Sequence, residues 1–317
     1  MNIGIIGSGS YGVALLSSLV KSNNITLYTR FKEEEEYLLK NRKSPKIDYL
    51  IPSKVEITSD KELLKNKDLI IIAIPTEGID LIKELKPFIK SSNILIATKG
   101  ITNDGYFVYE IVKNILNTNK VGIISGPSFA NDVIKGYPIG LSLACKSNNF
   151  KNICLKVFKN TNIKLRPTKD MIGISICGSI KNVVAIVAGI LDALNCPMST
   201  KAMLVTESLH DIKNLIKLLG GSSKTFTSFA GFGDMMLTCS SIESRNYTFG
   251  KYLVEKDKTF LEEYRKNTTI EGLYTLNSIY KLLKNKKISI PLIDIIYEIV
   301  YKNKNPEKLL TFLLEKE

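Results

Sequence analysis

The first half of the chain alternates short apolar runs with stretches in which apolar residues recur every three or four positions. The short runs predict β-strands, and the periodic stretches predict amphipathic helices. Strands are predicted at residues 2–6, 25–28, 55–58, 68–74, 93–97 and 121–124. Because most of these strands are apolar throughout and are separated by helices, we expect a parallel sheet with helices on both faces.

The pattern changes near residue 170, where the strand-like runs stop. From there onward the apolar spacing predicts helices, among them residues 203–219, 252–265, 274–283 and 292–301. The chain is therefore predicted to have an α/β N-terminal domain at residues 1–170 and an all-α C-terminal domain at residues 171–317. An acidic run at residues 33–36 in the first domain predicts a solvated helix start.

A glycine-rich loop lies between the first predicted strand and the helix predicted at residues 11–21. Residues 7–12 read Gly-Ser-Gly-Ser-Tyr-Gly, which matches the loop that binds a dinucleotide in this structural context. Gly7 would make the tight turn, Gly9 would let the backbone approach a pyrophosphate, and Gly12 would let helix and strand pack closely. The alternative is a glycine-rich turn without a ligand.

The end of the second predicted strand bears on the choice of dinucleotide. An NAD-specific site usually places Asp or Glu there, to bind the ribose hydroxyls. This chain has Thr29 and Arg30 instead, and Arg30 could hold the 2′-phosphate of NADP. The cofactor is therefore predicted to be NADP or NAD. The alternative for Arg30 is a solvated arginine at a strand end.

Lys181 stands alone in an apolar run at residues 174–190. Desolvation disfavours the charged form of a lysine and lowers its pKa, so such a lysine can exchange protons with a substrate near neutral pH. Together with a dinucleotide, this residue indicates hydride chemistry. The alternative is a lysine whose aliphatic stem is buried while its amine reaches solvent.

Composition and charge exclude several other classes of protein. The 44% hydrophobic and 24% charged content is typical of a soluble globular protein. Residues 172–194 are apolar enough for a membrane span, but Lys181 would then lie near mid-bilayer at a cost of at least ~2.5 kcal/mol, so we expect a buried core helix. The five cysteines form no CxxC pair, which predicts a reducing, cytoplasmic location and no metal site.

The net charge of +13 has two interpretations. It could attract anionic ligands such as phosphorylated substrates, or it could reflect a lysine-rich composition. The lysines are spread along the chain and are poorly interleaved with aromatic residues, so no nucleic-acid partner is predicted. The single histidine, His210, lies in a predicted helix, which disfavours a histidine-based dehydrogenase.

Seven short motifs occur in one order along the chain. They are GSGSYG at 7–12, Lys99-Gly100, GPSFAND at 126–132, GSIKNVVAI at 178–186, GFGD at 231–234, LTCSSIESRN at 237–246 and Ile270-Glu271-Gly272. Together they resemble the bacterial NAD(P)-dependent glycerol-3-phosphate dehydrogenases. The resemblance covers nearly the whole chain, and GPSFA, the KN pair and SRN are specific when found together.

The resemblance implies a Rossmann-like N-terminal domain, a helical substrate-binding domain and a set of site residues. The residue matching the proton acceptor is Lys181, which also contacts substrate. The other implied substrate-binding residues are Lys99, Gly126, Ser128, Asp234, Ser244, Arg245 and Asn246. The implied cofactor contacts are Gly7, Gly9, Ser10, Tyr11, Gly12, Arg30, Lys99, Ala130, Arg245, Thr269 and Glu271.

Three positions depart from the family pattern, and none of them removes a catalytic group. Tyr11 stands where the family often has Trp, and Asp132 stands where Glu is usual. Thr269 replaces a common aliphatic residue, which makes it the least secure of the cofactor contacts.

The predicted function is the interconversion of sn-glycerol 3-phosphate and dihydroxyacetone phosphate, which supplies glycerol 3-phosphate for phospholipid synthesis. A homodimer is expected by analogy alone, with no stable membrane insertion. Two alternatives stay open at this point. One is a related two-domain hydroxyacid dehydrogenase, and the other is a non-catalytic dinucleotide sensor with the same fold.

Overall fold

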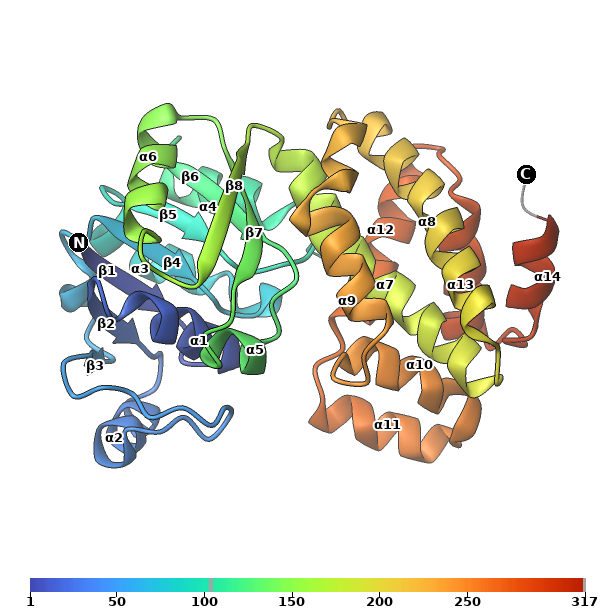
Figure 1. Cartoon of the computed structure of the whole chain (residues 1–317), viewed down its shortest axis with the longest axis horizontal. Helices are drawn as coiled ribbons and strands as arrows, with labels where there is room; N and C mark the ends of the chain where they lie inside the picture. Colours follow the sequence, from blue (N-terminus) through green and yellow to red (C-terminus); the bar gives the residue numbers. More distant parts are fainter. Residues whose placement is uncertain (103–104, 316–317) are drawn as a thin grey trace. The chain divides into compact units, whose positions relative to one another are not determined.

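The computed structural model describes residues 1–102 and 105–315, and the chain divides into two units (Figure 1). Unit 1 comprises Met1–Lys99 and Val108–Met171, and unit 2 comprises Gly100–Phe107 and Ile172–Glu317. The segment Gly100–Phe107 therefore groups with the helical unit, although the sequence analysis placed it in the first domain. The reason is local packing within unit 2, where Gly105 lies against the side chain of Leu282.

Unit 1 is built on one sheet, which has eight strands within the described residues. The strands are β1 (Asn2–Ile6), β2 (Asn24–Tyr28), β3 (Glu56–Thr58), β4 (Leu69–Ile72), β5 (Asn93–Ile96), β6 (Val121–Ser125), β7 (Ile139–Cys145) and β8 (Ile163–Thr168). Their order across the sheet is β3-β2-β1-β4-β5-β6-β7-β8. Every neighbouring pair is parallel except β6 and β7, which are antiparallel. The expected parallel sheet therefore carries a reversal that was not predicted.

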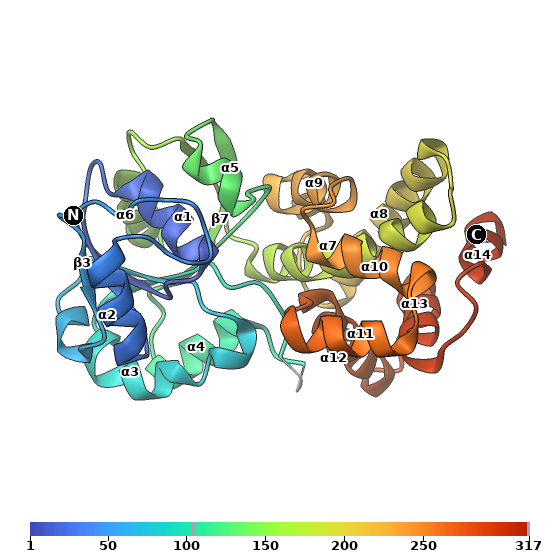
Figure 2. The same cartoon turned by 90° about the horizontal axis from the view of Figure 1, so that it is seen from below.

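Helices cover both faces of this sheet (Figure 2). The helices of unit 1 are α1 (Ser10–Leu19), α2 (Lys32–Asn41), α3 (Leu81–Ile89), α4 (Val108–Leu116), α5 (Ala130–Ile134) and α6 (Asn148–Val157). Ile5 and Ile71 pack in the core beneath α1 and α6, and the next residues in each strand, Ile6 and Ile72, pack in the core beneath α3 and α4. This alternation follows from the two-residue period of a strand, and it places apolar side chains on both faces.

The last two strands of the sheet, β7 and β8, were absent from the sequence analysis. In β7 the side chains of Leu141 and Leu143 enter the core, while Gly140 and Ser142 alternate with them along the strand. Strand β8 is at the edge of the sheet, where Pro167 is tolerated. Neither strand has the continuous apolar run by which most of the other strands were recognised.

Unit 2 is helical and is organised around one apolar helix. Its helices are α7 (Met171–Ala193), α8 (Met198–Leu218), α9 (Asp234–Cys239), α10 (Arg245–Glu255), α11 (Lys258–Asn267), α12 (Glu271–Asn285), α13 (Pro291–Lys302) and α14 (Lys308–Glu315). Helix α7 is long and apolar enough to cross a membrane, but 94% of its apolar window is buried inside the structure. It is the core helix that the sequence predicted.

Helices α7 and α10 pack with their backbones in close contact. A Cβ atom on Gly189 would lie 2.0 Å from the carbonyl oxygen of Tyr247, and one on Gly250 would lie 2.0 Å from that of Ile186. Only glycine permits this approach, which fixes the start of α10 relative to α7.

One predicted helix of unit 2, residues 252–265, is wrong as a single element. The structure has α10 ending at Glu255 and α11 beginning at Lys258. Asp257 caps α11 by accepting a hydrogen bond of 2.9 Å from the backbone N–H of Phe260. The apolar spacing continues across the break, so periodicity alone did not reveal this cap.

Candidate active site

The glycine loop of unit 1 joins the end of β1 to the start of α1, as predicted. Gly7 has a φ of +116°, and a Cβ atom there would lie 2.5 Å from the carbonyl oxygen of Ala73. A Cβ atom on Gly12 would lie 2.0 Å from the carbonyl oxygen of Gly7. A Cβ atom on Gly9 would meet nothing within 4 Å. Gly7 and Gly12 are therefore required by the fold, whereas the space beside Gly9 is open.

This loop fits the pyrophosphate of a dinucleotide. Gly9 is the N-cap of α1 and supplies no side-chain hydrogen bond to the helix. The first N–H groups of a helix carry partial positive charge, so an uncapped N-terminus beside open space suits an anion. Ser10 and Tyr11 form the first turn of this helix, and the hydroxyl of Ser10 donates to the carbonyl oxygen of Lys46 at 2.9 Å.

At the end of β2, Thr29 is buried and the side chain of Arg30 is directed toward α3. The Arg30 side chain is half exposed and lies 3.1 Å from the carboxylate of Glu84 on α3, which also pairs with Lys61. The hydroxyl of Thr29 donates to Glu34 on α2. Sequence reasoning missed Glu34, because it treated residues 33–36 as a solvated run.

The solvated helix start is in part a wrong prediction. Glu35 is only 7% exposed, and its carboxylate accepts hydrogen bonds from Lys32 at 2.7 Å and from Ser59 at 2.5 Å. Burial alone would raise the pKa of Glu35, but these hydrogen bonds hold it below its usual range. The available signal was helical spacing, since only one side of the run can face solvent.

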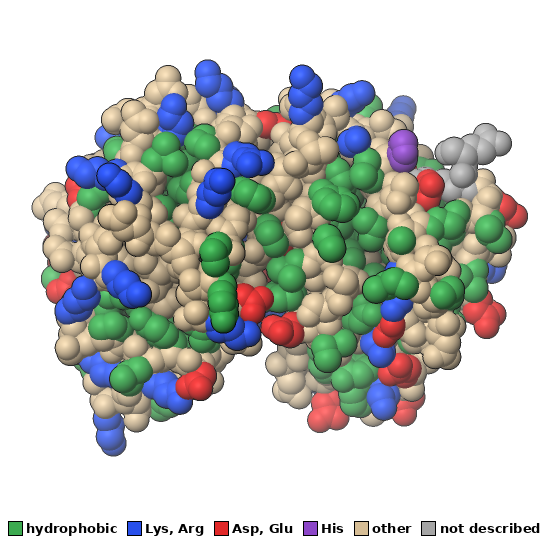
Figure 3. All heavy atoms as spheres, viewed as in Figure 1, with side chains coloured by type: hydrophobic (Ala, Val, Ile, Leu, Met, Phe, Trp, Pro, Cys, Tyr) green, Lys and Arg blue, Asp and Glu red, His purple; other side chains and the backbone are tan. Residues whose placement is uncertain are grey.

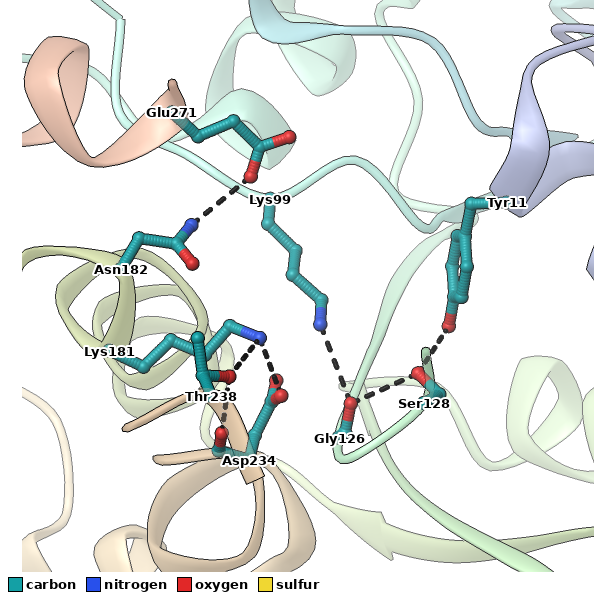
Figure 4. A network of polar contacts seen from close by, with 9 residues as sticks. All are labelled: Tyr11, Lys99, Gly126, Ser128, Lys181, Asn182, Asp234, Thr238 and Glu271. Carbon is teal, nitrogen blue, oxygen red and sulfur yellow. Dashed lines mark hydrogen bonds and ion pairs between the residues drawn. The ribbon is translucent and has the colours of Figure 1, made fainter. Parts of the chain in front are cut away.

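A second polar network in unit 1 joins four of the predicted site residues (Figure 4). The Ser128 hydroxyl donates to the carbonyl oxygen of Gly126 at 3.0 Å, and the Lys99 amine donates to the same oxygen at 3.4 Å. Tyr11 lies 3.0 Å from the Ser128 oxygen. Since the Ser128 proton is already committed to Gly126, the Tyr11 hydroxyl is the donor. The last predicted residue of this region, Ala130, is the first residue of α5.

The backbone at Lys99 is held by the ends of two strands. Thr98, which follows β5, donates from its hydroxyl to the carbonyl oxygen of Ile74 at 2.7 Å. The hydroxyl of Thr76 donates to the carbonyl oxygen of Lys99 at 2.9 Å. The lysine thus extends from a fixed point at the carboxyl edge of the sheet, where open α/β sheets bind ligands.

In unit 2, Lys181 forms a buried ion pair with Asp234 (Figure 4). Lys181 is 7% exposed and Asp234 is 1% exposed. The Lys181 Nζ atom lies 2.5 Å from Asp234 Oδ1 and 3.1 Å from Thr238 Oγ1. Burial disfavours the charge of this lysine and the carboxylate favours it, so the two influences oppose each other. The side chain of Lys181 is 8% exposed, so it is not a solvated surface lysine.

Thr238 is a site residue that sequence reasoning missed. Its hydroxyl donates to the carbonyl oxygen of Asp234, one helical turn earlier, at 2.6 Å. The Thr238 oxygen therefore acts as an acceptor toward Lys181. The signal was its position four residues after Asp234, on the same face of a helix. A π-helical turn, Phe229–Gly233, directly precedes Asp234, the first residue of α9.

Cys239, next to Thr238, is a buried free cysteine. Burial raises the pKa of its thiol to about 12, although the charge of Lys181 acts in the opposite direction. The thiol therefore stays protonated near neutral pH and is not a nucleophile. Cys239 is 5% exposed and fills the interior of unit 2 as a small buried residue.

The remaining predicted residues of unit 2 lie at the starts of α10 and α12. Ser244 caps α10 by accepting from the N–H of Tyr247 at 3.3 Å, and Arg245 is the first residue of that helix. The Asn246 side-chain oxygen accepts from the N–H of Gly272 at 2.8 Å. Glu271 accepts a hydrogen bond of 3.1 Å from Asn182, the neighbour of Lys181 (Figure 4).

The structure therefore joins most predicted residues into local networks within each unit. Thr269 is an exception, because it is exposed and lies between α11 and α12. His210 is exposed on α8. Lysine and arginine side chains are dispersed on the face drawn in Figure 3, as expected from their spread along the sequence. Among the described residues, no group of His, Cys, Asp and Glu could hold a metal ion.

A sheet with a phosphate-binding loop, followed by a helical unit with a buried lysine, defines a two-domain nicotinamide-dependent oxidoreductase. Two family models match the chain. The model described as NAD-dependent glycerol-3-phosphate dehydrogenase N-terminus matches residues 2–151, and the corresponding C-terminus model matches residues 170–311. The chain belongs to this family, so the predicted family, enzyme class and use of NAD or NADP are confirmed.

Individual relatives agree with the family models. A Fusobacterium nucleatum protein named glycerol-3-phosphate dehydrogenase (NAD(P)+) is 33% identical, over 99% of this chain and 96% of its own length. A Francisella tularensis protein of the same name is 33% identical, over 100% of this chain and 98% of its own. The crystal structure of glycerol-3-phosphate dehydrogenase from Coxiella burnetii is 30% identical, covers 99% of both chains and has a TM-score of 0.91.

A more distant neighbour bears on one alternative. A ketopantoate reductase from Ralstonia eutropha has a TM-score of 0.62 and only 13% identity, while covering 98% of this chain and 100% of its own. That likeness shows a shared fold alone. The support for a related hydroxyacid dehydrogenase is therefore weaker than the support for the glycerol-3-phosphate dehydrogenase family.

Proposed function

We propose that this protein interconverts sn-glycerol 3-phosphate and dihydroxyacetone phosphate, with NAD or NADP as the hydride carrier and Lys181 as the general acid and base. The observation that carries the proposal is the buried Lys181–Asp234 pair, braced by Thr238, in a chain that belongs to this family. A lysine held in a fixed place, away from bulk water, suits proton transfer to or from a single substrate oxygen.

The residues of unit 1 would hold the dinucleotide. The pyrophosphate would lie on the N-terminus of α1, against the open space beside Gly9. Tyr11 and Ala130 would line the same site, and Lys99 would provide a further contact. The resemblance also assigns Arg245, Thr269 and Glu271 to the cofactor, whereas Arg30 is paired with Glu84 in this structure. When bound, the nicotinamide accepts or supplies the hydride. The residues of the protein would position the reacting groups and transfer the proton.

Lys181 would move the proton. In the direction of oxidation, its neutral amine takes the proton of the C2 hydroxyl as the hydride leaves C2. In the direction of reduction, its ammonium polarises the ketone and then protonates the oxygen. Acid–base groups of this kind typically contribute ~10²–10⁴ to the rate. Asp234 and Thr238 would fix the direction in which the amine points.

The start of α10 would bind the substrate phosphate. Arg245 offers a planar fork of donors that suits two phosphate oxygens, and Asn246 adds an amide beside it. Ser244 ends the preceding loop and sets where the helix begins. Lys99, Gly126 and Ser128 would contribute polar contacts from unit 1. The product, glycerol 3-phosphate, would enter phospholipid synthesis, and the enzyme would work in the cytoplasm as a homodimer without stable membrane insertion.

The first test is a rate measurement on the wild-type protein. Dihydroxyacetone phosphate is supplied with NADH and, separately, with NADPH, and loss of nicotinamide absorbance is followed. Turnover is expected, while ketopantoate and 6-phosphogluconate in matched assays with the corresponding oxidised or reduced cofactor should give none. Folded protein that turns over dihydroxyacetone phosphate with neither nicotinamide would rule out the proposal and favour the sensor alternative.

The second test is Lys181→Ala. Cofactor binding should be retained, and turnover should fall at least ~10²-fold because the proton has no carrier. Lys201→Ala is the matched control, since Lys201 also forms an ion pair with an aspartate of unit 2 but has no proposed chemical role. Near-normal turnover in Lys181→Ala would show that another group moves the proton.

A further inference from the structure

Beside the glycine loop lies one carboxylate that the proposed reaction does not use. Glu34, on the first turn of α2, accepts a hydrogen bond of 2.7 Å from the hydroxyl of Ser8. Its other oxygen accepts from the hydroxyl of Thr29, which directly follows β2. Ser8 is 5% exposed and Thr29 is 1% exposed, so the carboxylate is anchored to buried groups at the ends of two neighbouring strands.

This position is where a dinucleotide fold reads the adenosine ribose. An acidic side chain at the end of the second strand usually accepts hydrogen bonds from the ribose hydroxyls. Here Thr29 occupies that place in the sequence, but its hydroxyl binds the carboxylate of a residue five positions later. The acid is thus supplied to the end of β2 by helix α2.

Two basic side chains among the described residues bear on the charge at this position, Lys46 and Arg30. Lys46 lies 3.8 Å from Glu34 Oε1 and is more than half exposed. Arg30, the residue able to receive a 2′-phosphate, is instead paired with Glu84 at 3.1 Å, and Lys61 shares that carboxylate. The group anchored at the end of β2 is therefore the Glu34 carboxylate, and Arg30 is directed to α3.

We propose that Glu34 binds the adenosine ribose hydroxyls and makes this protein prefer NAD(H) to NADP(H). A carboxylate has about four acceptor positions, and Ser8 and Thr29 occupy one on each oxygen, which leaves acceptors for a 2′- or 3′-hydroxyl. The 2′-phosphate of NADP would bring a second anion against the first, which is strongly unfavourable. This inference rests on the proposed function only in requiring that a dinucleotide binds.

The test is a binding measurement that needs no turnover. Dissociation constants for NADH and NADPH are obtained from nicotinamide fluorescence, for the wild type and for Glu34→Gln. The wild type should bind NADH at least about tenfold more tightly than NADPH. Glu34→Gln should reduce this ratio at least about fivefold, because the repulsion is removed while the side chain keeps its size and one acceptor oxygen.

Glu33→Gln is the matched control. It removes the same charge from the same turn of α2, but Glu33 is exposed and the neighbouring Glu34 carries the contacts to the loop. Its NADH-to-NADPH ratio should equal that of the wild type. An equal change in both variants would show a general charge effect and would overturn the assignment to Glu34.

Two further outcomes would overturn the proposal. Equal binding of NADPH and NADH by the wild-type protein would overturn the proposal without any variant. That result would not contradict the proposed dehydrogenase activity. An unchanged ratio in folded Glu34→Gln would also overturn the proposal. Glu34→Asp offers a second variant that keeps the charge, and its preference for NADH should persist with weaker binding, because the shorter side chain moves the carboxylate from the ribose.

Discussion

The two units prepare their binding groups in opposite ways. In unit 1 the glycine loop is made within six consecutive residues, and its chemistry is that of backbone N–H groups and the absence of Cβ atoms. In unit 2 the central feature is a buried ion pair between residues 53 positions apart. The first arrangement should tolerate changes of charge but not of volume. The second should tolerate little change of charge, because each partner is buried with the other.

The largest effect is expected from Asp234→Asn. This variant leaves the Lys181 ammonium buried without its carboxylate, and breaking a buried pair in this way typically costs about 3–5 kcal/mol. Urea unfolding should show a loss of that size, together with a large fall in turnover. The double variant Lys181→Met/Asp234→Asn should be more stable than the sum of the two single losses predicts, because it removes both charges.

Additive losses in that cycle would contradict the view that unit 2 depends on the pair. Unchanged turnover in Asp234→Asn would show that Lys181 does not need the carboxylate to hold its position. Either result would mean that unit 2, like unit 1, does not depend on a buried charge pair.

The next effect separates two glycines of the loop. Gly12→Ala would place a Cβ atom 2.0 Å from the Gly7 carbonyl oxygen, so we expect about 1–3 kcal/mol of destabilisation and the loss of NADH binding. Gly9→Ala would meet no protein atom, so its stability should stay near that of the wild type while NADH binding weakens. Thermal unfolding and fluorescence titration measure the two quantities. Full NADH binding by Gly9→Ala would show that the pyrophosphate does not lie there.

The same contrast explains which parts of the molecule the sequence could predict. The strands recognised by continuous apolar runs, such as β4 and β5, are central and buried on both faces. Strands β7 and β8 mix small or polar residues with apolar ones and were missed. The loop of unit 1 was predicted because its residues are adjacent and their glycines are dictated by local backbone geometry.

The site of unit 2 could be predicted only in part. Lys181 was found because a lone charge in an apolar helix is unusual, and Asp234 was found as a substrate-binding residue implied by the resemblance. Thr238 could not be found without knowing that its helix begins at Asp234 and faces α7. Glu34 was missed for a similar reason, since the direction of one glutamate among four depends on how α2 packs. Contacts between distant residues are set by packing, which a local pattern does not encode.

A smaller effect concerns a second ion network in unit 2, outside the proposed site. The Asp192 carboxylate pairs with Lys251 at 2.8 Å and with Lys201, which ties α7 to α10 and α8. Burial alone would raise its pKa, but hydrogen bonds from Lys201, Lys251 and Tyr247 hold the pKa of Asp192 at about 2. Because the folded pKa is depressed, the stabilisation is present above about pH 4 and is lost as the pH falls toward 2.

Asp192→Asn should therefore cost about 2 kcal/mol at neutral pH and progressively less below about pH 4. Urea unfolding of both proteins across this range measures the difference. A gap between wild type and variant that stays constant down to about pH 2 would show that the carboxylate charge is not the source of the stability. Unit 1 has no part in this prediction, so NADH binding by the folded variant should be unchanged.

The smallest effect tests whether the start of α10 binds phosphate. Ser244→Ala removes the N-cap, which should cost about 1 kcal/mol of stability and loosen the turn that carries Arg245 and Asn246. The KM for dihydroxyacetone phosphate should rise about two- to fivefold with little change in kcat, because a contact at a helix start acts on ground state and transition state alike. Asp257→Ala removes the equivalent cap of α11 and should cost similar stability without changing KM. If both variants raise KM equally, general loosening of unit 2 is the cause, and the phosphate is bound elsewhere. A rise confined to Ser244→Ala would support phosphate binding by the backbone N–H groups at the start of α10, the arrangement proposed for the pyrophosphate at α1.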